Sequence, residues 1–177
     1  MDLHLVLLLA CAHAAPPATP AAPVPTAFAE SMLAAHNRAR CLHGVPPLAW
    51  SDDVAAYAQT WVNGLSSMQH SDSYQAPIGP LGENLYATNG PVNAADVVAL
   101  WYSEGAQYRY GDDFQPGSGH FTAMIWRDAR VLGCGVHDGI VSCNYGSGTK
   151  TLDCATPNLG GCFAAEVPRP VVGASCP

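Results

Sequence analysis

The residue best placed for chemistry in this chain is His120, which stands second in an apolar, helix-length stretch at residues 119–128. The first N–H groups of a helix have no partner within the helix, so His120 is expected near a polar chain end rather than inside a packed helix. An imidazole there can move a proton or give a neutral nitrogen to a metal ion. The position predicts a site histidine but indicates no particular reaction.

No nucleophile accompanies this histidine in a recognisable arrangement. The chain contains neither a Gly-x-Ser-x-Gly elbow nor a His-Glu-x-x-His pair. Ser71 beside His70 and Thr122 beside His120 are sequence neighbours, which does not make a triad. We therefore assign no catalytic residue and expect a protein that is not an enzyme.

The cysteines indicate a structural role. Of the seven, Cys11 lies in a candidate leader peptide, and six remain: Cys41, Cys134, Cys143, Cys154, Cys162 and Cys176. An even number in a secreted chain predicts three disulfides. Since no Cys-x-x-Cys occurs, neither a zinc knuckle nor a thioredoxin-type site is indicated.

One disulfide follows from turn chemistry. An Asp138-Gly139 pair between apolar runs is typical of a two-residue hairpin turn, with strands at 133–137 and 140–145. That register sets Cys134 opposite Cys143, with Cα atoms about 4.5–5.5 Å apart, within reach of a disulfide. The other four cysteines allow three pairings, of which we favour Cys154–Cys162 and Cys41–Cys176.

The first residues predict export. Residues 5–12 are apolar, and Ala12-His13-Ala14 fits a cleavage site, although Asp2 and His4 stand where such leaders usually carry basic residues. The run is too short to cross a bilayer, so no transmembrane segment is expected. We predict a signal peptide at 1–14, a Pro/Ala-rich linker at 15–26, and an extracellular protein.

The length of the chain indicates the number of domains, and its charge limits the classes of binding partner. A chain of 177 residues favours one domain. Without residues 1–14 it carries 7 basic and 13 acidic residues, and the basic ones do not cluster. Binding to nucleic acid through phosphates, or to anionic lipid surfaces, is therefore not expected. The oligomeric state is left open.

Four helices and a small antiparallel sheet are expected to position His120. Thr26, Ser51 and Asn93 are candidate N-caps for the first three helices. The fourth covers residues 119–126, and 83–87 forms a further short strand. The second helix carries one apolar stripe, and we interpret the tryptophans at core spacing as packing: Trp61, Trp101 and Trp126.

Three other histidines are interpreted as structural or solvent-exposed. His36 lies at helical spacing in the first helix, where we expect a hydrogen bond within that helix rather than a ligand role. His43 and His137 fall in predicted turns and are expected to be solvated.

Several motifs in order resemble those of the CAP superfamily, which contains cysteine-rich secretory proteins, antigen 5 and pathogenesis-related class 1 proteins. They are His36-Asn37-Arg38-Ala39-Arg40, Pro47-Leu48-Ala49-Trp50, Gly82-Glu83-Asn84-Leu85, Trp101-Tyr102-Ser103-Glu104, the stretch from Gly119 to Asp128, and Cys143-Asn144-Tyr145. The resemblance covers about residues 27–170, with a tail at 171–177. It implies an α+β fold, a three-layer α-β-α sandwich.

The resemblance also implies a cleft in which two histidines and two glutamates converge: His70, Glu83, Glu104 and His120. These residue types suit Zn²⁺, so a divalent metal is a possible ligand, although none is required for folding. Their spacing carries no independent signal. Taken singly, His70 reads as an exposed loop residue, Glu83 as an edge-strand charge and Glu104 as a solvated helix face.

Sterol-binding relatives of this family imply a small apolar ligand, such as a sterol or fatty acid, or a role in extracellular defence. Residues 71–82, with Tyr74, Ile78 and Leu81, either flank an apolar pocket or form a solvent-exposed insertion. A second insertion at 146–156 leaves the far wall of the cleft unassigned. The alternatives are a metal-dependent hydrolase or protease that uses the four residues, and a protein-binding surface module.

Overall fold

A four-stranded sheet forms the middle layer of the computed structural model, which describes residues 24–176. The strands are β1 (Ala49–Trp50), β2 (Gly82–Ala87), β3 (Val131–His137) and β4 (Ile140–Gly146), in the order β1-β3-β4-β2. β3 pairs antiparallel with β4, and β4 with β2, whereas the two-residue β1 runs parallel to β3. The sheet is therefore mixed, because β1 adds a parallel edge to the predicted antiparallel strands.

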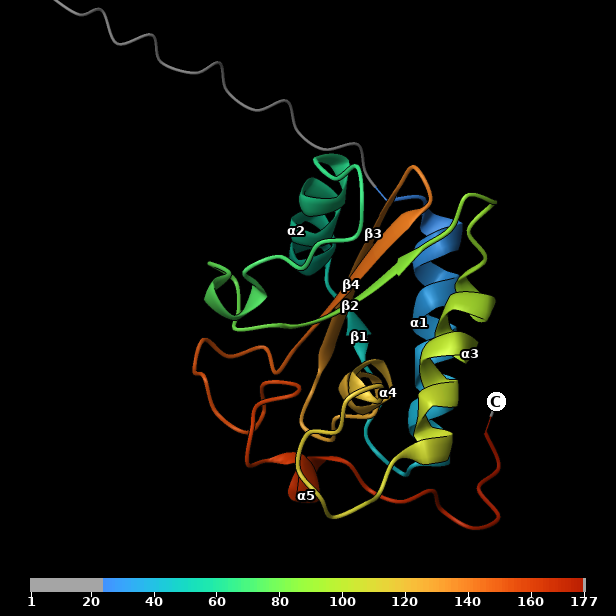
Figure 1. Ribbon diagram of the computed structural model, residues 1–177, viewed down its shortest axis with the longest axis vertical. Helices are drawn as coiled ribbons and strands as arrows, with labels where there is room; N and C mark the ends of the chain where they lie inside the picture. The colour runs from blue at the N-terminus through green and yellow to red at the C-terminus, as the bar shows by residue number, and fades with distance from the viewer. Residues whose placement is uncertain (1–23, 177) are drawn as a thin grey trace, which may run out of the picture.

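Helices cover both faces of this sheet (Figure 1). On one side lies α2 (Asp52–Asn63); on the other lie α1 (Thr26–Leu42), α3 (Ala94–Ser103) and α4 (Gly119–Met124). Short turns of helix follow at η1 (Ser73–Gln75), η2 (Glu104–Gln107) and α5 (Phe163–Glu166). This arrangement confirms the predicted α+β sandwich.

The predicted caps hold for two helices. The Ser51 hydroxyl accepts from the Val54 N–H, and Asn93 Oδ1 accepts from the N–H groups of Ala95 and Asp96. Thr26 is not a cap, because α1 already begins at Thr26 and the preceding residue is Pro25, which offers no side-chain acceptor.

Two glycines of β3 let α2 lie directly on the sheet. A Cβ at Gly133 would lie 2.2 Å from the Ala55 nitrogen, and one at Gly135 would lie 2.4 Å from the Gln59 nitrogen. The Gln59 side chain then accepts from the Val136 N–H and donates to the Val136 carbonyl, each at 3.0 Å. The Gln59 side chain thus takes the hydrogen bonds that a neighbouring strand would make to β3 beyond the end of β1.

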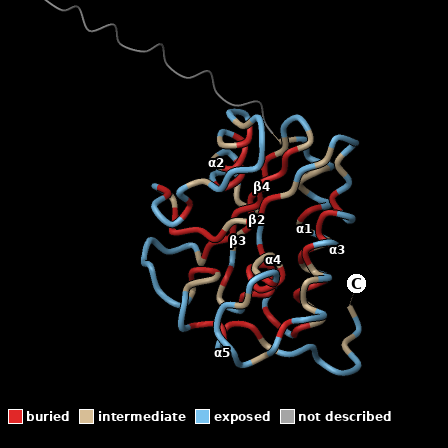
Figure 2. Tube along the Cα trace, in the orientation of Figure 1, coloured by how far each residue is buried: buried red, intermediate tan, exposed pale blue. Residues whose placement is uncertain are grey.

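The main core lies between the sheet and the α1–α3–α4 layer, as the buried segments in Figure 2 indicate. Trp101 and Trp126 are buried there as predicted. The prediction for Trp61 is wrong in part: α2 buries Val54, Ala58 and Val62 but leaves Trp61 half-buried at the surface. The apolar stripe of α2 is wider than the surface with which the helix contacts the sheet, so the sheet leaves its outer residue Trp61 partly exposed.

Two of the three histidine interpretations are confirmed. His36 is buried, with Nδ1 2.7 Å from the Met32 carbonyl of the same helix, and His137 is exposed. The expectation that His43 is solvated is wrong. His43 is buried, with hydrogen bonds to the Pro168 carbonyl and the Tyr102 hydroxyl, because the chain after α5 returns across the end of α1.

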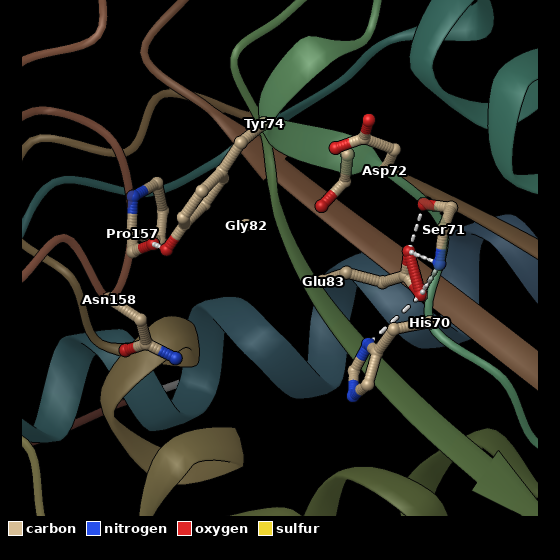
Figure 3. Close-up of a pocket in the computed structure, with 9 residues that line it drawn as sticks. His70, Ser71, Asp72, Tyr74, Gly82, Glu83, Pro157 and Asn158 are labelled. Atoms are coloured by element: carbon tan, nitrogen blue, oxygen red, sulfur yellow. Dashed lines mark hydrogen bonds and ion pairs between the residues drawn. The ribbon is translucent and has the colours of Figure 1, made fainter.

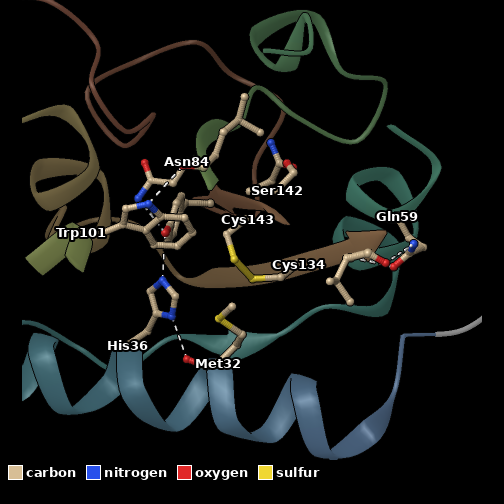
Figure 4. Close-up of a disulfide and its surroundings, with 12 residues drawn as sticks. Met32, His36, Gln59, Asn84, Trp101, Cys134, Ser142 and Cys143 are labelled. Atoms are coloured by element: carbon tan, nitrogen blue, oxygen red, sulfur yellow. Dashed lines mark hydrogen bonds between the residues drawn. A yellow bond between two sulfur atoms is a disulfide. The ribbon is translucent and has the colours of Figure 1, made fainter. Parts of the chain in front are cut away.

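All three expected disulfides are present. Cys134 and Cys143 face each other in the β3–β4 ladder, with Cα atoms 4.1 Å apart (Figure 4). Cys154–Cys162 closes a short loop, and Cys41–Cys176 joins the end of α1 to the tail. Within residues 24–176 no helix is long and apolar enough to span a membrane. The predicted signal peptide lies outside the described residues.

Candidate functional site

The first two site residues form a hydrogen-bonded pair beside β2. Glu83 lies on this edge strand, yet its side chain is only 2% exposed, because the chain around residue 71 covers it. His70 Nδ1 lies 3.2 Å from Glu83 Oε1, and Ser71 donates to the same carboxylate through its backbone N–H and its hydroxyl. Hydrogen bonding to Glu83 raises the pKa of His70 above its usual range.

The other two site residues form a second pair at the start of α4. His120 Nδ1 lies 2.5 Å from Glu104 Oε1, while Glu104 Oε2 accepts from the backbone N–H groups of His120 and Phe121. Glu104 therefore acts as the cap that α4 lacks at Ser118. The Trp101 ring stacks against the imidazole, with centroids 5.8 Å apart and an interplanar angle of 18°.

Both pairs flank β2 but remain separate pairs. Asn84, next to Glu83, donates to the His120 carbonyl at 3.0 Å, which ties α4 to this strand. Within residues 24–176, however, no three His, Cys, Asp or Glu side chains are grouped as a single metal ion needs. The residues present therefore do not make up a closed zinc site, and we derive no step through a metal.

Glu83 also decides against a serine triad at this position. It lies between Ser71 and His70 and bonds both, so the imidazole has no contact with the serine hydroxyl. A triad needs the histidine between the other two, because the histidine must take the proton of the nucleophile. All six cysteines of the described chain are bridged as well.

A cavity of about 270 Å³ opens beside the first pair (Figure 3). Most of the residues that line it carry a polar group on the side chain, with Gly82 and Pro157 as the exceptions: His70, Ser71, Asp72, Ser73, Tyr74, Gly82, Glu83, Pro157 and Asn158. The wall that the sequence left unassigned is thus Pro157-Asn158, which directly follows the second insertion at 146–156. Asn158 also accepts from the Thr122 hydroxyl and donates to the Gly119 carbonyl, which connects this wall to α4.

An apolar groove of about 340 Å³ lies on the outer face of α2, lined by Ala56, Tyr57, Thr60 and Trp61. The chain that follows α2 folds back against it. The Trp61 indole donates to the Gln69 carbonyl, and the Tyr57 hydroxyl donates to Ser71 Oγ at 3.1 Å. Tyr57 of the groove thus touches Ser71 of the polar cavity.

Residues 71–82 form neither the flank of an apolar pocket nor a fully solvent-exposed insertion, which were the two alternatives from the sequence. Leu81 is buried and packs with Val54 and Ala76, and Ile78 packs against them, in a small second core beneath α2. The apolar side chains of this segment therefore support the fold, and only Tyr74 reaches the cavity.

The family described as CAP, the cysteine-rich secretory protein family, matches residues 33–147, which is more than half of the chain. The chain belongs to the CAP family. This CAP protein is 40% identical over 127 residues to pathogenesis-related protein 1A1 of Solanum lycopersicum, a match that covers 66% of the chain and 69% of that relative.

A second relative is the secreted protein RBT4 of Candida albicans, 34% identical over 155 residues. That match covers 80% of the present chain but only 40% of the relative. Among solved structures, NaASP2 with Zn²⁺ is similar, with a TM-score of 0.57 at 20% identity over 82% of this chain and 93% of that one. At this identity the likeness shows the fold.

Proposed function

We propose that this CAP protein acts outside the cell as a non-enzymatic binding protein for a small apolar ligand, a sterol or a fatty acid, in defence or signalling. The groove on α2 carries the proposal. Its walls are two aromatic side chains that the sheet leaves uncovered, Tyr57 and Trp61. Concave apolar surface of this kind is the usual lining of small-molecule sites.

Two observations support an extracellular location. Three disulfides are typical of chains that fold in an oxidising compartment. One relative carries the word "secreted" in its name.

The hydrolase alternative has less support. Both glutamates are already engaged by a histidine and by backbone N–H groups, so neither is a free base facing an open site. Zinc binding stays a prediction, with the Nε2 atoms of His70 and His120 as the nitrogens that the glutamates leave available.

The first test fills the groove. Thr60 is an exposed residue of the groove lining, so Thr60→Arg places a long charged side chain there without removing a buried contact. We expect a labelled sterol or fatty acid to bind the oxidised protein saturably at micromolar concentration, and this substitution to weaken binding about tenfold or more.

Ser66→Arg is the matched control, since it adds the same charge at an exposed position outside the groove. It should bind as the unmodified protein does. Absence of saturable binding, or equal affinity of both variants, would contradict the proposal.

A further inference from the structure

We propose that the polar cavity beside His70 is a separate site for a neutral sugar ring at the end of a glycan. The inference does not depend on the apolar groove, which takes a different class of ligand. The cavity draws on three segments: residues 70–74, β2, and the Pro157-Asn158 wall (Figure 3).

The groups that line the cavity can form hydrogen bonds with the hydroxyl groups of a sugar. Asp72 offers only acceptors, whereas the Asn158 amide offers both an acceptor and donors. His70 Nδ1 faces a carboxylate and therefore carries its proton, which leaves Nε2 as an acceptor in the neutral ring. A site for a bare cation needs acceptors only, but a sugar hydroxyl both donates and accepts, so mixed groups suit it.

The side chains are held in place from behind. Ser71 fixes Glu83, Glu83 fixes His70, and α4 fixes Asn158 through Thr122 and Gly119. A site whose groups already have one geometry loses little entropy when a ligand binds. This matters for sugars, whose hydroxyl groups lose hydrogen bonds to water on binding.

Tyr74 supplies an aromatic wall. Tyr74 is 37% exposed, and its hydroxyl donates to the Pro157 carbonyl at 2.9 Å, which holds the ring against this wall of the cavity. In Figure 3 Tyr74 and Pro157 lie on one side, with Ser71, Glu83 and His70 on the other. The apolar C–H face of a pyranose can stack on such a ring while its hydroxyls reach the polar side.

The volume of the cavity and the charge of its lining limit the class of sugar that it can bind. Sites for drug-sized molecules are typically about 300–1,000 Å³, so 270 Å³ suits one ring with the rest of the glycan outside. The lining contains two carboxylates, Asp72 and Glu83, and neither Lys nor Arg. Acidic sugars would meet like charge, and neutral sugars would not.

The test measures binding of three neutral trisaccharides (maltotriose, laminaritriose and chitotriose) by calorimetry and saturation-transfer NMR, with tri-galacturonic acid as the acidic comparator. We expect at least one neutral trisaccharide to bind saturably, and tri-galacturonic acid to bind more weakly. Tyr74→Ala should weaken binding about tenfold, whereas Tyr74→Phe, which keeps the ring, should stay within about threefold.

Asp72→Asn provides a second variant at an exposed position, where folding is not at risk. It should raise the affinity for the acidic trisaccharide, because it removes a like charge. Phe114→Ala, an exposed aromatic outside the cavity, should change nothing.

The inference is overturned if no neutral trisaccharide saturates the protein at millimolar concentration. It is equally overturned if Tyr74→Ala, with an unchanged thermal unfolding curve, binds as well as Phe114→Ala. Because the groove and the cavity share no lining residue, absence of sterol binding to the unmodified protein with intact sugar binding refutes the proposed function alone, and the reverse refutes only this inference.

Discussion

Replacement of Arg40 by alanine is expected to lower the free energy of unfolding by about 3–5 kcal/mol. Arg40 is fully buried on α1, and its guanidinium donates to backbone carbonyls on either side of it: Pro46, Met124, Trp126, Arg127 and Ala129. Met124 is the last residue of α4, and three of the others belong to the chain that follows it. Without the guanidinium the carbonyls of Pro46 and Met124 lose the donor it supplies, whereas those of Trp126, Arg127 and Ala129 keep the Ala129 N–H or the Arg130 guanidinium. Each buried group left unsatisfied is costly.

Arg40→Lys should recover only part of this loss, since an ammonium cannot spread its donors as a planar guanidinium does. Arg38→Ala is the control, because Arg38 lies exposed on the same helix. Urea unfolding of the oxidised protein measures all three. A loss below about 1 kcal/mol for Arg40→Ala would show that water replaces the guanidinium and that the carbonyls are not sealed.

The second large effect is expected from acid, through His36. Burial lowers the pKa of His36 from 6.5 to about 4. Its Nδ1 donates to the Met32 carbonyl (Figure 4). Nε2 must therefore accept from the Tyr145 hydroxyl, 2.9 Å away. A second ring proton would remove that acceptor. The folded protein therefore holds His36 neutral.

Between pH 6.5 and 4 the unfolded chain binds a proton at His36 and the folded protein does not, so stability falls as pH falls. One pKa unit corresponds to about 1.4 kcal/mol, which gives a loss of about 3 kcal/mol across this window. His43, whose pKa burial also lowers, adds in the same direction. His70, whose pKa its hydrogen bond to Glu83 raises, changes its contribution only above pH 6.5, so it adds no slope in this window.

Unfolding free energies measured from pH 7 to 4 test this expectation. His36→Gln should be less stable at pH 7 but should lose less on acidification than the unmodified protein. His137→Gln, at an exposed position on the hairpin, should keep the full pH dependence. If His36→Gln and the unmodified protein show the same slope, His36 is not the group responsible.

The local parts of the fold could be predicted because short-range chemistry determines them. Asp138-Gly139 sets the β3–β4 register, and with it the Cys134–Cys143 bridge. Ser51 and Asn93 cap their helices by contacts within three residues. The parallel pairing of β1 with β3 could not be predicted, since its two residues carry no periodic pattern.

The site was only partly predictable. The resemblance supplied His70, Glu83, Glu104 and His120, but the division into two pairs depends on how residues 70–71 cross β2, which no spacing reveals. Asn158 was missed, although an asparagine before two nearby glycines is a turn signal, and it does adopt φ +64°. Trp61 was interpreted as core because a helical period does not say how wide a face the sheet covers.

The most direct test of the proposed function follows the four tryptophan indole N–H signals by NMR during titration with a sterol. Trp101 and Trp126 are buried in the core and Trp50 lies on β1, so only Trp61 lines the groove. We predict that the Trp61 signal shifts saturably while the signals of Trp101 and Trp126 stay in place. A saturable shift at Trp101 or Trp126 with Trp61 unmoved, or no shift at any of them, would contradict binding in the α2 groove.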